Sequence, residues 1–239
     1  MGKNEKAVFP LVMAILASAA FIAAYLVFTV FAVKPLWLHA LAFAVPAAVF
    51  FALFVLAKKD VLREKTANIL TGILTPLFIM GCAVLFIAFF FLFTLSDVTD
   101  PSCYKRALSK NGYPQSELIS QFPEEIPQEA EDVSFLYRPQ FLQGAGEFLL
   151  ACRLPDSAVR ALKDEYEGEA VWTGTEAELP SSPYDSGLLP HTVRGYADEN
   201  AEILILLAEP YMQGSYNHGS LKLILFGESG RTVFYSSVW

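Results

Sequence analysis

Three long apolar stretches occupy the first 95 residues and constrain the fold more than any other feature. They run from Ala7 to Val33, from Leu36 to Ala57 and from Ile69 to Leu95. No Asp, Glu, Lys or Arg lies inside them, and His39 is their one histidine. About 20 apolar residues, at about 1.5 Å of rise each, cross a bilayer core of about 30 Å. The stretches therefore predict a transmembrane domain over residues 1–96, built as a three-helix bundle.

The basic residues of the short segments predict the orientation of these helices. One basic residue, Lys34, lies between the first and second helices. Six lie in the amino-terminal tail and in the loop before the third helix: Lys3, Lys6, Lys58, Lys59, Arg63 and Lys65. Because basic loops stay in the cytoplasm, we expect a multi-pass plasma-membrane protein with a cytoplasmic amino terminus and an extracytoplasmic carboxy-terminal domain.

The alternative for the first stretch is a cleaved signal peptide. Ala17-Ser18-Ala19 resembles a cleavage site, but apolar sequence continues for 14 residues beyond Ala19. That continuation favours an uncleaved spanning helix.

Small residues in the first two helices predict close helix packing. Ala40, Ala44, Ala48 and Ala52 recur every fourth residue, and the first helix offers Ala19, Ala20, Ala23 and Ala24. Such stripes let helix backbones approach each other closely in lipid. The lipid bilayer is the partner expected for the whole transmembrane domain. We expect them to close the bundle within one chain; the alternative is docking to another membrane protein or to a second copy through the stripe at residues 40–52. Each of the three stretches carries a proline: Pro10, Pro46 and Pro76. Pro46 lies mid-span, where it could break the helical hydrogen bonds and make a kink, but prolines are also common in uninterrupted spanning helices.

The remainder of the chain, residues 97–239, predicts an acidic domain outside the membrane. It carries 22 acidic and 10 basic side chains, a charge of −12, whereas the first 96 residues contribute +4 to the chain's −8. Because this charge repels phosphate backbones, it argues against a nucleic-acid partner.

In this domain, runs of predicted strands with a helix between them indicate an α+β fold with a mainly antiparallel sheet, covered by helices on one side. Short helices are expected at residues 102–111 and 114–121, and a longer one from Asp156, as its cap, to Tyr166. Strands are expected at residues 133–137, 147–154, 170–173, 201–208, 221–226 and 232–238. Gly227 to Gly230 forms a hairpin loop between the last two strands, and residues 178–190 form a surface loop.

Few residues of the domain carry recognisable chemistry. The sequence has none of the nucleophile-elbow, zinc-protease, phosphate-loop or paired-cysteine motifs, so no catalytic residue, metal ligand or cofactor is predicted. A binding loop is expected around His191 and at Tyr216, Asn217 and His218. Cys103 and Cys152 are candidates for a disulfide, which an extracytoplasmic location permits. In the chain-entropy model, that bridge would stabilise the domain by about 4 kcal/mol.

One segment resembles a bacterial domain whose activity is uncharacterised. The resemblance is carried by Phe122-Pro123-Glu124-Glu125-Ile126-Pro127, followed by Ala130, Phe135, Tyr137, Pro139, Phe141 and Gln143-Gly144. Such domains occur in membrane-anchored and lipoprotein-like surface proteins of the cell envelope. The resemblance implies a bacterial extracytoplasmic domain and supplies no function or catalytic residue.

Two functional hypotheses follow. The missing motifs favour a membrane-anchored binding or interaction domain over an enzyme. The alternative is a small surface enzyme, such as a hydrolase, with its site in the loops of His191 and His218; a deep polar pocket joining either histidine to an acid would support it.

Overall fold

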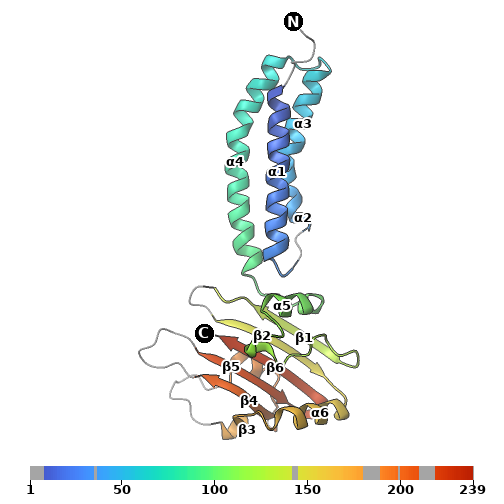
Figure 1. The fold of residues 1–239 in the computed structure, drawn as a ribbon, viewed down its shortest axis with the longest axis vertical. Coiled ribbons are helices and arrows are strands. Elements are labelled where there is room, and N and C mark those ends of the chain that lie inside the picture. The colour runs from blue at the N-terminus through green and yellow to red at the C-terminus, as the bar shows by residue number, and fades with distance from the viewer. Residues whose placement is uncertain are drawn as a thin grey trace, which may run out of the picture. The chain divides into compact units, whose positions relative to one another are not determined.

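In the computed structural model, the chain forms two compact units, residues 1–94 and residues 95–239. The structure describes residues 8–34, 37–141, 145–179, 189–198, 200–209 and 219–238. The first unit is all-helical and the second is built on one sheet (Figure 1). The sequence predicts the boundary after residue 96, and the assignment of the two parts as transmembrane and extracytoplasmic stays a prediction.

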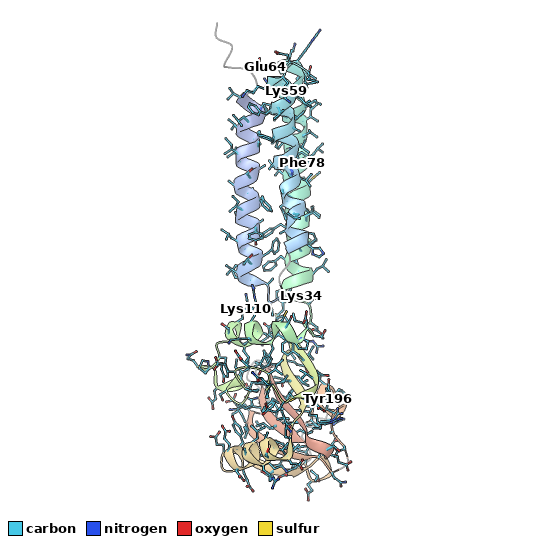
Figure 2. All side chains as sticks on the ribbon, turned by 90° about the vertical axis from the view of Figure 1, so that its right-hand side faces the viewer. Lys34, Lys59, Glu64, Phe78, Lys110 and Tyr196 are labelled. Carbon is cyan, nitrogen blue, oxygen red and sulfur yellow. The ribbon has the colours of Figure 1, made fainter. Side chains whose placement is uncertain are left out.

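The first unit holds three helical segments that are long and apolar enough to cross a membrane, as expected from the apolar stretches. The first is α1 (Val8–Phe31) and the third is α4 (Glu64–Thr94). The second is interrupted: α2 (Trp37–Ala40) and the 3₁₀ helix η1 (Leu41–Ala44) precede α3 (Val45–Lys58). Lys34 lies at one end of the bundle, and Lys59 and Glu64 lie at the other (Figure 2).

Pro46 explains the interruption of the second segment. Because proline has no N–H group and its ring collides with the preceding turn, it fits best in the first turn of a helix, although Pro76 lies inside the continuous α4. Pro46 accordingly occupies the first turn of α3, directly after η1. The second segment is thus interrupted beside Pro46, whereas Pro76 leaves α4 continuous.

The third helix begins earlier than expected, at Glu64 rather than Ile69. Glu64, Lys65 and Thr66 are polar, but they have adequate helix propensity, so they extend α4 beyond the apolar run. Apolarity predicts where a helix can cross a membrane, whereas helix propensity decides where it starts.

Packing of α3 differs from the expectation based on the alanine stripe. Ala40 is buried, but Ala48 and Ala52 are exposed. The buried face of α3 instead carries Pro46, Phe50 and Ala57. On α1 the outcome is similar, because Ala24 is buried and Ala19, Ala20 and Ala23 are exposed. The larger ring of Phe50 provides the contact area, so the expectation that Ala48 and Ala52 close the bundle is wrong.

The second unit is built on a six-stranded, fully antiparallel sheet, with spatial order β1-β2-β6-β5-β4-β3. The strands are β1 (Glu131–Arg138), β2 (Gly146–Arg153), β3 (Trp172–Thr175), β4 (Glu202–Glu209), β5 (Ser220–Phe226) and β6 (Arg231–Val238). The helices are α5 (Tyr104–Lys110), α6 (Asp156–Tyr166) and α7 (His191–Arg194). Short 3₁₀ helices are η2 (Pro101–Cys103), η3 (Glu117–Ile119), η4 (Glu176–Glu178) and η5 (Glu228–Gly230).

Most of the expected elements of this unit are present. The six strands lie within two residues of their expected positions, and the loop between β5 and β6 is the predicted hairpin loop. Of the helix expected at residues 114–121, only the short 3₁₀ helix η3 forms. Asp156 lies in the first turn of α6 and does not cap it; Pro155 holds the cap position. In the first turn of α6, the carboxylate of Asp156 still lies near the positive end of the helix dipole.

Both faces of the sheet are covered, which corrects the expectation of helices on one side. One face carries Phe148, Phe234 and Phe226, which contact Tyr104 of α5, Phe122 and Lys163 of α6, respectively. The other face packs Leu149, Leu223 and Tyr235 against Leu189 and Val193 of the α7 region. Because side chains alternate along a strand, the continuous apolar runs of β2, β4 and β5 bury a layer on each face of the sheet.

Candidate functional site

The residues expected to form a binding loop are only partly described. His191 is the first residue of α7, and its side chain is exposed. It makes no hydrogen bond or ion pair with any described residue. Tyr216, Asn217 and His218 lie outside the described residues, so the loop they were expected to form stays a prediction.

Glu147, a largely buried carboxylate, is the centre of a polar cluster among the described residues of the sheet unit. It stands at the start of β2, and its side chain is 10% exposed. Arg138 Nη1 donates to Oε2 at 2.6 Å, while the hydroxyls of Tyr235 and Thr192 donate to Oε1 at 2.9 and 3.1 Å. Burial raises the pKa of Tyr235, so its hydroxyl remains protonated and continues to donate.

The guanidinium group of Arg138 also binds Asp97, near the start of the sheet unit. Arg138 Nε and Nη2 donate to the two carboxylate oxygens of Asp97, at 2.9 and 2.7 Å. Next to this bidentate pair, the backbone of Val98 pairs with that of Tyr137 on β1. The pair therefore fixes residues 97 and 98 along the outer edge of β1.

A pocket of about 230 Å³ opens beside this cluster, where β1 and β6 end and β2 begins. Its wall combines polar residues with the apolar residues Leu118 and Ile119. The polar members of the wall are Asn111, Ser116, Arg138, Gln140, Glu147 and Ser236. Both oxygens of Glu147 already accept hydrogen bonds from side chains, which suits a structural anchor better than a general base.

A second buried polar residue, Lys222, lies on the opposite face of the sheet. Its Nζ donates to Ser120 Oγ at 2.8 Å, and burial lowers its pKa, opposed by the negative charges of Glu169 and Glu117. Lys222 is flanked by Leu221 and Leu223, and the alternation of β5 could have indicated an inward lysine. The Glu147 cluster gave no comparable signal, because Asp97, Thr192 and Tyr235 lie 50, 45 and 88 positions from Glu147.

The described residues contain no group of three or more His, Cys, Asp or Glu placed to hold a metal ion. Comparisons with known protein families, curated proteins and solved structures found no match for this chain. The proposals below therefore rest on the residues and on the fold.

The substitution Glu147→Gln tests whether the carboxylate of Glu147 stabilises the sheet unit. The amide removes the charge that pairs with Arg138, and it can present only one acceptor oxygen to three donors. We expect a loss of about 2 kcal/mol in the free energy of unfolding of the sheet unit, measured by pulse proteolysis in urea on the full chain in detergent. The matched control is Glu125→Gln, which breaks the ion pair between Lys105 and Glu125, two side chains that are 64% and 70% exposed. We expect no measurable change there, since exposed pairs contribute little. Equal losses in the two variants would contradict the anchoring role.

Cys103 and Cys152 are both buried and both carry free thiols in the structure. Cys152 lies on β2, on the same face of the sheet as Phe148. The ring of Phe148 contacts that of Tyr104, which follows Cys103 directly in the chain. A disulfide between them in the oxidised protein stays a prediction.

Burial raises the pKa of Cys152 from 9.0 to about 11, which predicts slow alkylation. The thiolate is the reactive form, and its fraction falls tenfold for each unit by which the pKa exceeds the pH. At pH 8 we expect alkylation of Cys152 by iodoacetamide to be about 100-fold slower in the native chain than in the urea-unfolded chain. Peptide mass spectrometry without reductant measures both rates. Protection that persists in urea until reductant is added would indicate the disulfide, whereas equal native and unfolded rates would contradict burial of the thiol.

Proposed function

We propose that this chain is an integral membrane protein of the bacterial cell envelope, which presents an acidic binding domain on the extracytoplasmic side. The observation that carries the proposal is the division into two self-contained units. One has three helices apolar enough to cross a membrane, and the other has a two-layered core of its own. A protein that required only a soluble domain would not need three such helices.

The placement of charge supports the proposed orientation. Lys34 stands at one end of the bundle, and Lys59, with its basic neighbours Lys58, Arg63 and Lys65, stands at the other (Figure 2). Under the positive-inside rule the latter end is cytoplasmic, and α4 then leads the chain to the outside. The bilayer is the first partner that we propose, and the exposed Ala48 and Ala52 offer a close-packing surface to another membrane protein or a second copy.

A binding role suits the sheet unit better than catalysis does. The carboxylate of Glu147, at the centre of its polar cluster, is already occupied by donors of the same unit. The acidic surface favours basic or neutral partners, because the domain carries 22 acidic against 10 basic side chains.

Cysteine labelling in intact cells tests the location and orientation. The substitutions Glu125→Cys and Lys59→Cys place thiols at exposed positions in the sheet unit and in the loop before α4, and the native thiols of the sheet unit are buried. A membrane-impermeant maleimide is expected to label position 125 in intact cells and position 59 only after permeabilisation. The reverse pattern would overturn the orientation, and a chain released from membranes by alkaline carbonate would overturn membrane insertion.

The binding role is tested separately by affinity purification of the full chain from solubilised membranes. We expect at least one protein to co-purify in stoichiometric amount and to be lost at high salt, since an acidic surface binds through charge. A single-component, monodisperse preparation at low salt would contradict this part of the proposal.

A further inference from the structure

The three-helix bundle packs unevenly along its length. At the end that carries Lys34, phenylalanine rings from three segments meet: Phe28 lies 5.2 Å from Phe86 and 5.9 Å from Phe43, and Phe43 lies 5.9 Å from Phe89, between ring centroids. These aromatic contacts fill the space between the helices.

The half of the bundle nearer Lys59 contains a cavity of about 390 Å³. It lies between α1, α3 and α4, because Ala17 and Ala20 present little volume toward Pro46 and Phe50. The other residues lining it are Met13, Leu16, Thr75, Phe78, Ile79 and Cys82, and Phe78 lies midway along the bundle in Figure 2. Thr75 already donates its hydroxyl to the carbonyl of Thr71 at 2.7 Å, so the cavity offers an apolar lining suited to hydrocarbon.

A polar pocket lies at the end of the same seam between α1 and α4. It is lined by Phe9 of α1 and by Glu64, Lys65, Asn68 and Ile69 of α4. Phe9 precedes Met13 of the cavity by one helical turn, and Asn68 precedes Thr75 by two. The Oδ1 atom of Asn68 is buried and accepts no hydrogen bond from the described residues. A buried acceptor without a donor is costly, and a ligand hydroxyl or N–H would satisfy it.

The two sites together have the dimensions and chemistry of one lipid molecule. From Phe9 to Ala20 the helix rises about 16 Å, which is about half of a bilayer core of about 30 Å and so the depth of one leaflet. The polar end also carries the exposed basic residues Lys58, Lys59 and Arg63 near Lys65, against the acidic Asp60 and Glu64. The excess of positive charge complements a phosphate.

We propose that the seam between α1 and α4 binds one anionic phospholipid of the surrounding leaflet. Its phosphate pairs with Lys65, a headgroup hydroxyl donates to Asn68 Oδ1, and one acyl chain fills the cavity beside Ala20. The inference rests on the proposed function, because it requires the bundle to lie in a bilayer.

Native mass spectrometry of the full chain tests this site. The protein is transferred from phosphatidylglycerol nanodiscs into mild detergent, and the wild type is expected to retain one phosphatidylglycerol molecule. The substitution Ala20→Phe fills the cavity and is expected to abolish this one-to-one complex. The matched control is Ala23→Phe, since Ala23 is equally exposed on α1 but does not line the cavity. Equal retention in the three proteins, or no retention by the wild type, would overturn the proposal.

A headgroup variant makes the test independent of packing in the bundle. Lys65→Gln changes an exposed side chain, and we expect it to lose the preference for phosphatidylglycerol over phosphatidylcholine nanodiscs while the acyl chain still binds. An unchanged preference would refute the headgroup site. Carbonate extraction of the same variants separates this inference from the proposed function: a chain that stays in membranes without retaining lipid contradicts only the lipid site.

Discussion

Replacement of Gly230 by alanine is expected to destabilise the sheet unit more than the same change at any other described glycine. Gly230 ends the loop between β5 and β6 with φ of +78°, a conformation that disfavours residues with a β-carbon. A β-carbon there would lie 2.1 Å from the carbonyl oxygen of Leu154. The contact cannot relax easily, because the N–H of Leu154 donates to the carbonyl of Gly230 at 2.8 Å. We expect a loss of about 3 kcal/mol or more in the free energy of unfolding.

The control for this change is Gly195→Ala. Gly195 follows α7 with φ of −65°, and a β-carbon there would meet no atom within 4 Å. We expect a change within about 0.5 kcal/mol, measured for both variants by pulse proteolysis in urea on the full chain in detergent. If the two glycines tolerate alanine equally well, the close approach of residues 154 and 230 is incorrect.

Replacement of Phe148 by alanine is the second large expected effect. The side chain of Phe148 is 3% exposed and stands at the centre of an aromatic cluster on one face of the sheet. Its ring centroid lies 4.8 Å from that of Phe122, 5.5 Å from Phe135 and 6.0 Å from Tyr104. Truncation leaves a cavity among rings held by β1, β2 and α5, so it removes both burial and ring contacts. We expect a loss of about 3–5 kcal/mol in the free energy of unfolding.

Two companion variants define the origin of that loss. Phe148→Leu keeps much of the volume and should cost about half as much. Phe141→Ala removes a ring that is 41% exposed, and we expect a change below about 1 kcal/mol. Denaturation in urea measures all three, with an unchanged slope if only stability is altered. A Phe148→Ala variant as stable as Phe141→Ala would contradict the burial of the cluster.

The helices of the first unit and the strands of the second follow from local patterns. Apolar runs of more than 20 residues have few alternatives to spanning helices, and a short apolar run between Gly146 and Pro155 specifies β2. The start of α4 at Glu64 and the reduction of residues 114–121 to η3 show where such patterns are weakest, at element ends.

The candidate sites depend on contacts that local patterns do not contain. Glu147 receives one donor from Arg138, its cross-strand partner on β1, and two from distant segments, Thr192 of α7 and Tyr235 of β6. Nothing near Glu147 in the chain distinguishes it from the other acidic residues of the domain. The lipid site between α1 and α4 is equally hidden in the sequence, because nothing near Ala20 in the chain shows that it lines a cavity with residues of α3 and α4.

By itself, the sequence determined the existence of three helices apolar enough to cross a membrane and the antiparallel strands. Each of these depends on residue chemistry within one segment, where hydrophobicity and backbone conformation act locally. Only the tertiary structure decided that helices cover both faces of the sheet, that Phe50 rather than Ala48 packs within the bundle, and that Glu147 is a buried anchor. These features depend on which distant segments pack together, and such pairings are chosen by the burial and hydrogen bonding of the whole unit.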